Sequence, residues 1–199
     1  LTPVSPNKFT GKNMALRIKS HWHDDEQERS LEEIAGAVAY IIWRIAKDKA
    51  ITLHGEDFVY QNDRQRMDAI LEYVIFQLNI TDRLASLRYA MEDEQRQEMI
   101  YAVTKKLAAH VYGNSIELFG EDDHIGDFIS RLNARGEDYS ELNYTDEGPS
   151  YPFLRHFGYC MQMIMGDDGE NRWVIDQVMD KDGPDVVKQL TRAIDNLFE

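Results

Sequence analysis

One apolar segment, residues 31–47 (LEEIAGAVAYIIWRIAK), limits what this chain can fold into more than any other stretch. Its apolar residues recur at the i, i+3, i+4 and i+7 positions of a helix. Four residues mark the side that can meet water: Glu33, Tyr40, Arg44 and Lys47. We therefore expect a helix buried on more than one side, started by a capping box of Ser30 and Glu33. The run is shorter than the roughly 20 residues that a bilayer requires, so it is not expected to cross a membrane.

The same periodicity recurs along the chain and predicts an all-α fold. The further helices are expected at about residues 62–79, 81–91, 95–112, 122–136, 150–165, 173–178 and 185–198. Residues 81–91 and 95–112 can also be one bent helix, and Gly113 with Asn114 is the expected stop. The fold class is thus a compact multi-helix domain of about seven or eight helices. Residues 51–60 are either one small β-hairpin or an irregular crossover.

The domain organisation follows from the same pattern. Residues 1–20 contain prolines and little helical periodicity, and we expect a flexible or extended N-terminal arm there. No linker long enough to separate two domains follows, so residues 21–199 are predicted to form a single helical domain. Residues 137–148 (EDYSELNYTDEG) are the clearest loop.

Two helices carry more apolar residues than one buried face needs. In residues 62–79, Tyr73 and Phe76 belong to a second stripe opposite the main one, so this helix is either enclosed or shared with a partner subunit. In residues 150–165, Tyr151, Tyr159 and Met163 are the residues expected to point outward. This surplus motivates an interface hypothesis, with a homodimer as its simplest form.

The net charge of the chain limits the classes of function that it can have. The chain has 36 acidic and 22 basic residues and a formal net charge of −14. Nucleic-acid-binding proteins carry basic surfaces, so we expect no nucleic-acid partner. The acidity favours solubility, contact with a basic protein or mimicry of nucleic-acid charge.

Cys160 is the single cysteine, so no intrachain disulfide can form. With no signal-peptide core visible, we expect a cytoplasmic protein.

Two clusters have residue types that bind metals. His21 and His23 lie two residues apart and would share one side of an extended segment, with Asp24 and neighbouring acids able to complete a ligand set. Glu121 and His124 have the Glu-x-x-His spacing of helical di-iron proteins, but the sequence contains one copy where such sites need two. The simpler interpretation of both is solvated polar sequence around helix starts.

Cys160 follows His156 by four residues, so the two can approach on one helix as a thiolate and imidazole pair. The apolar residues around Cys160 favour a buried, inert thiol instead. No catalytic, cofactor-binding or metal-binding residue is assigned from the sequence.

Two functional hypotheses remain. The first is a non-enzymatic binding or regulatory protein acting through protein–protein contacts, such as an immunity-type or charge-mimic inhibitor of a basic partner. The alternative is a metal-dependent helical enzyme that uses the His21/His23 and Glu121/His124 regions. Coordinates that bring these histidines into one pocket would favour the second.

Overall fold

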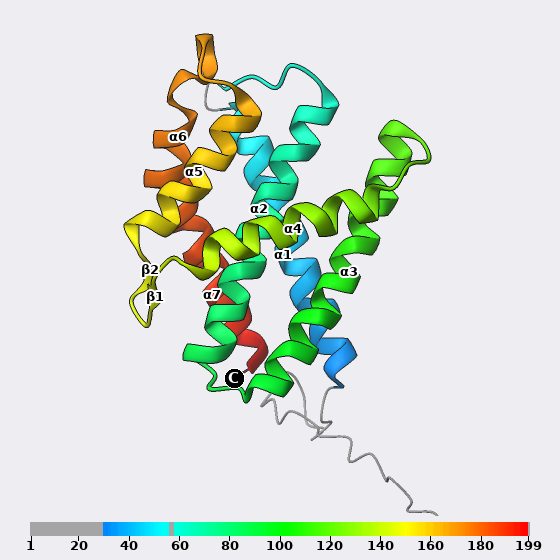
Figure 1. Ribbon diagram of the computed structural model, residues 1–199, viewed down its shortest axis with the longest axis vertical. Helices are drawn as coiled ribbons and strands as arrows, with labels where there is room; N and C mark the ends of the chain where they lie inside the picture. The colour runs from blue at the N-terminus through cyan, green and yellow to red at the C-terminus, as the bar shows by residue number, and fades with distance from the viewer. Residues whose placement is uncertain (1–29, 56–57, 199) are drawn as a thin grey trace, which may run out of the picture.

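The structure, a computed structural model, describes residues 30–55 and 58–198. The predicted arm of residues 1–20 lies outside the described residues. Within them the fold is all-α, as predicted, with six helices of 15 to 27 residues. These helices are α1 (Leu31–Gly55), α2 (Asp63–Leu87), α3 (Asp93–Phe119), α4 (His124–Ser140), α5 (Tyr151–Met165) and α7 (Gly183–Phe198). In Figure 1, α1, α2 and α3 run alongside one another, α4 crosses them obliquely, and α5 and α7 lie on the other side of α2.

The apolar helix α1 is buried on several sides, as its sequence predicts. It packs against α2, α3 and α7. The four residues expected to meet water, Glu33, Tyr40, Arg44 and Lys47, are all exposed. The capping box also forms, because the backbone N–H of Ser30 donates to the Glu33 carboxylate (2.8 Å) and the N–H of Glu33 donates to the Ser30 hydroxyl (3.3 Å).

Helix α2 is enclosed rather than shared with a partner. All residues from 71 to 78 are buried, so every face of these two turns is covered. The second apolar stripe meets α5: the ring of Phe76 stacks on Phe157 with centroids 4.0 Å apart, and Tyr73 meets Phe157 edge-on at 5.2 Å. Tyr73 and Phe76 are 0% exposed, so this stripe forms core and not an outer interface.

Two predicted helix boundaries are wrong, and the first of them lowers the helix count because it divided α2. Thr81 does not start a new helix: its hydroxyl donates to the Gln77 carbonyl (2.8 Å) within α2, which continues to Leu87. Gly113 and Asn114 do not stop α3 either. A glycine costs only about 1 kcal/mol inside a helix, and the chain turns instead at Gly120, whose φ of 80° suits glycine.

The small β-hairpin predicted near residues 51–60 is also wrong. Residues 51–55 complete α1, and residues 58–60 have no regular structure. A two-residue-per-strand antiparallel hairpin forms instead at the C-terminal end of the predicted acidic loop, from β1 (Tyr144–Thr145) and β2 (Gly148–Pro149). The weak alternation after residue 50 was misleading because Ala50 and Leu53 extend the buried stripe of α1 by one more turn.

The connection from α5 to α7 is a chain of short helical turns. It contains η1 (Gly169–Trp173), α6 (Val174–Gln177) and the π-helix η2 (Val178–Asp182). Helix α6 approaches α5 closely at Gly158, where a Cβ would lie 2.9 Å from the Ile175 carbonyl oxygen, so only glycine fits there. Across the described ranges, no helix combines the length and the apolar character needed to cross a membrane.

The stacked rings of Phe76 and Phe157 give a direct test of the core. We expect Phe76→Ala to lower the free energy of unfolding by about 3–5 kcal/mol, because it leaves a cavity among buried rings. Tyr101→Ala is the control, since Tyr101 on α3 is 72% exposed and should change stability by less than about 0.5 kcal/mol. Urea denaturation followed by circular dichroism measures both. Equal effects in the two variants would contradict the enclosed position of α2.

Candidate functional site

The predicted metal-binding clusters do not assemble within the described residues. His21 and His23 lie outside them. His124 is 4% exposed, and its Nε2 lies 2.8 Å from the Gly120 carbonyl oxygen. Glu121 is exposed and instead accepts a hydrogen bond from the Tyr112 hydroxyl (3.3 Å). Among residues 30–55 and 58–198, no group of three or more His, Cys, Asp and Glu side chains is placed to hold a metal ion.

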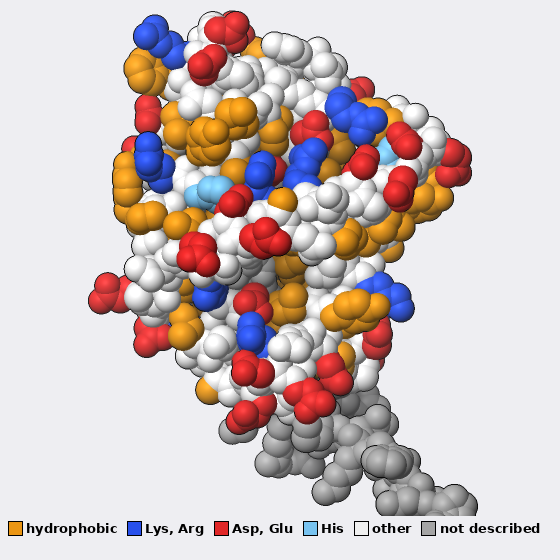
Figure 2. Space-filling model, in the orientation of Figure 1, with side chains coloured by type: hydrophobic (Ala, Val, Ile, Leu, Met, Phe, Trp, Pro, Cys, Tyr) orange, Lys and Arg blue, Asp and Glu red, His pale blue; other side chains and the backbone are white. Residues whose placement is uncertain are grey.

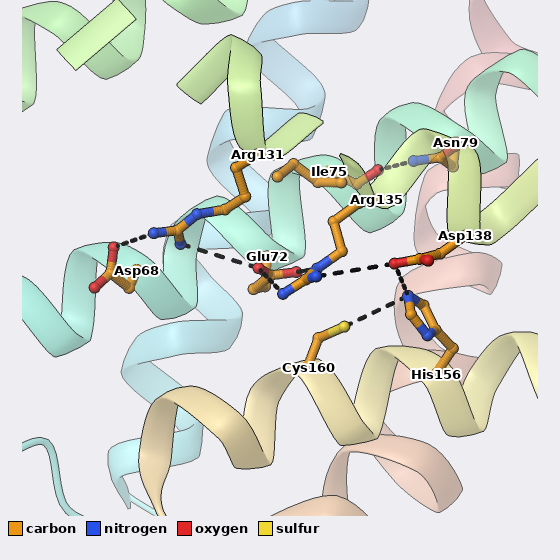
Figure 3. A network of polar contacts seen from close by, with 9 residues as sticks. All are labelled: Asp68, Glu72, Ile75, Asn79, Arg131, Arg135, Asp138, His156 and Cys160. Atoms are coloured by element: carbon orange, nitrogen blue, oxygen red, sulfur yellow. Dashed lines mark hydrogen bonds and ion pairs between the residues drawn. The ribbon is translucent and has the colours of Figure 1, made fainter. Parts of the chain in front are cut away.

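The largest polar cluster with described contacts is a charged network between α2, α4 and α5 (Figure 3). Its centre is Glu72, which is 1% exposed. Arg135 of α4 donates to both Glu72 carboxylate oxygens, at 3.2 and 3.3 Å. Arg131, one turn earlier on α4, donates to Asp68 (2.8 Å) and lies 3.9 Å from Glu72. A buried carboxylate destabilises the folded state unless it is paired and hydrogen-bonded. The two arginines therefore offset the desolvation cost of burying Glu72.

Sequence reasoning did not find this network, although a signal existed. Asp68 and Glu72 lie four residues apart, as do Arg131 and Arg135, so each pair shares one side of its helix. Two acids and two arginines at matching spacing are what a cross-helix ion-pair ladder requires. The sequence does not say, however, that α4 crosses α2 at this point.

Cys160 and His156 do approach each other, as their spacing on one helix suggested. The Cys160 sulfur lies 3.5 Å from His156 Nε2, and the Asp138 carboxylate lies 3.5 Å from the same nitrogen. A nucleophilic triad needs the acid on one ring nitrogen and the nucleophile on the other, so that the ring can pass a proton between them. Here both partners meet Nε2, and Figure 3 shows that the three side chains do not form a relay.

The electrostatics of this cluster also oppose a reactive thiol. Burial, and after it the nearby Glu72 carboxylate, raises the pKa of Cys160 to about 12. Burial lowers the pKa of His156 below its ordinary value, against the opposing effect of Asp138, so this ring is neutral at pH 7. A neutral imidazole beside a protonated thiol is a packing arrangement, and the cluster holds three helices together rather than activating a nucleophile.

The outer side of α5 has a different character. Tyr151, Tyr159 and Met163 are 63%, 53% and 65% exposed, as predicted. With the exposed Arg155 they occupy positions four residues apart, and we call these four residues the α5 face. Figure 2 shows hydrophobic side chains gathered on this side of the molecule, with acidic and basic side chains around them. Comparison with protein-family models, with curated proteins and with solved structures found no match to this chain.

The Glu72 network yields a prediction about stability. Arg135→Met should lower the free energy of unfolding by about 3–5 kcal/mol, because Glu72 then lies buried without its main partner. The double variant Glu72→Met/Arg135→Met should recover most of that loss, since no charge is left unpaired. Lys106→Met is the control: its partner Glu32 is 63% exposed, and such surface pairs contribute at most about 1 kcal/mol. Urea denaturation measures all three, and a double variant no more stable than Arg135→Met would refute this account.

The raised pKa of Cys160 yields a prediction about reactivity. On the order of one thiol in ten thousand is ionised at pH 8, and the thiolate is the reactive form. We expect negligible reaction of the folded protein with a thiol-specific disulfide reagent at pH 8, and complete reaction in guanidinium chloride. The absorbance of the released thiolate measures both. Rapid stoichiometric labelling of the folded chain would show that the thiol is activated.

Proposed function

We propose that the protein is a non-enzymatic binding or regulatory protein that acts through protein–protein contacts at the α5 face, and that its partner is a basic protein. The observation that carries the proposal is the row of Tyr151, Arg155, Tyr159 and Met163, since solvent covers these side chains along four turns of one helix. Tyrosine, methionine and arginine are enriched in protein interfaces, where large side chains bury much area at low entropic cost.

The distribution of charge supports a basic partner. Helix α5 contains one charged residue, Arg155, and no acid. Carboxylates outnumber bases beside it: Asp138 of α4 contacts His156 of α5, while Asp176 and Asp180, with one base, Lys181, are exposed on the α6–η2 segment that packs against α5. An apolar row with acids at its margins is complementary to a partner whose apolar patch is surrounded by lysine and arginine.

The acidic excess is concentrated between the helices. Residues 120–123 contain three acids and no base, as do residues 141–150. Such charges attract a basic protein over a distance of about a Debye length and raise its association rate more than its affinity. An inhibitor of the immunity or charge-mimic type would use charge in this way. The sequence also predicts a homodimer, in which a second copy of the chain would cover the α5 face.

The metal-dependent alternative receives no support from Glu121 and His124, whose side chains have separate partners. For His21 and His23 it stays a hypothesis, because both lie outside the described residues. Elemental analysis of the purified chain tests it.

The proposal is tested with Tyr159→Ser/Met163→Ser, which removes the centre of the α5 face. The control is Tyr40→Ser/Tyr101→Ser, because these tyrosines are 58% and 72% exposed on α1 and α3. We expect the immobilised wild-type chain and the control to retain one basic protein from lysate at low salt and to release it at high salt, whereas the α5 variant retains none.

Light scattering of each purified chain across a range of concentrations separates the two occupants. A dimer that the α5 variant loses would assign the face to a second copy. A monomeric wild-type chain that retains no protein beyond those the α5 variant retains would show that the proposal is wrong.

A further inference from the structure

A second recessed surface lies away from the α5 face, between the β1–β2 hairpin and α7. It is a groove of about 570 Å³, and the C-terminal end of α2 forms its floor. Figure 1 places the hairpin beside α7 on the side where α2 ends. This volume lies within the range of about 300–1,000 Å³ that small ligands occupy in proteins.

One wall of the groove is basic. Lys188 and Arg192 lie four residues apart on α7, and both are exposed. Neither side chain forms a hydrogen bond or ion pair with any described residue. Arg88, at the end of α2, is different, because it donates to both carboxylate oxygens of Asp195 at 2.7 and 2.8 Å and is held in place. Lys188 also attracts the Asp185 carboxylate one turn earlier on α7 without forming an ion pair with it, so Lys188 and Arg192 can both meet a ligand.

The opposite wall is acidic. Asp146 and Glu147 form the turn between β1 and β2, are exposed, and make no side-chain hydrogen bond or ion pair within the described part of the chain. Between the walls lie apolar side chains, including Leu84 and Leu87 of α2 and Val187 of α7.

The groove therefore has three cations and three carboxylates, and its formal charge is zero. A purely anionic ligand would be repelled by the hairpin turn, and a purely cationic ligand by α7. A ligand with one charge of each sign and an aliphatic body between them matches both walls and the floor. The geometry points to a short zwitterionic peptide, bound with its carboxylate toward Lys188 and Arg192 and its amino group toward Asp146 and Glu147.

The test uses the full chain and the tripeptide Ala-Leu-Ala, followed by isothermal titration calorimetry up to about 10 mM peptide. We expect saturable binding of the free peptide. N-terminal acetylation or C-terminal amidation should each weaken it about fivefold, which is what an exposed charge pair contributes. The doubly capped peptide should bind least.

Paired variants assign each end of the peptide. In Lys188→Ala/Arg192→Ala, amidation should no longer matter while acetylation still does, and Asp146→Asn/Glu147→Gln should show the reverse. Arg44→Ala/Lys47→Ala on the exposed side of α1 removes the same charge as the first variant and should bind like wild type. No binding of the free peptide, equal binding of the doubly capped peptide, or equal binding of hexanoate would overturn the proposal. None of these outcomes bears on the α5 face.

Discussion

The structure depends on the complete enclosure of α2. Eight consecutive residues of this helix are buried, so it must be covered by neighbours on every side at once. Helix α1 covers one side, α5 another and α4 a third. A helix buried on all sides removes more apolar surface from water than a helix at the surface does. It also fixes the positions of the covering helices, because cores are close-packed.

Enclosure also explains the polar groups inside the molecule. When a helix is buried on all faces, its polar side chains are buried too: Glu72 and Gln77 are 1% and 0% exposed. Gln77 donates to the carbonyl oxygens of Ile42 and Tyr73, and Glu72 is matched by Arg135 and Arg131. These contacts fix where α1 and α4 cross α2, since sliding either helix by one turn would leave a buried polar group unpaired. The Cys160 and His156 pair belongs to the same packing.

The two proposed binding surfaces share one physical basis: most of the charged side chains lie at the surface, outside the packed helix faces. Acids collect in the turns, the outer side of α5 is nearly free of charge, and the hairpin lies opposite α7 with unpaired groups on both walls of the groove. The α5 face is a row of exposed, mostly uncharged side chains, which suits the proposed protein partner. The groove has charges of both signs and a volume of about 570 Å³, which suits the proposed small ligand. The two surfaces can therefore act independently.

The sequence alone determined the helices and most of their starts. Periodicity and caps are local properties, so α1 with its capping box, the approximate starts of α2, α4 and α5, and the outward Tyr159 and Met163 could all be predicted. Tertiary structure decided which apolar faces meet. It placed Tyr73 and Phe76 inside, carried α2 past Thr81, and joined Glu72 to Arg135 across 63 residues. The apolar residues on a helix face show that the face must be buried, but they do not show which helix buries it. That partner is selected by packing between segments far apart in the chain.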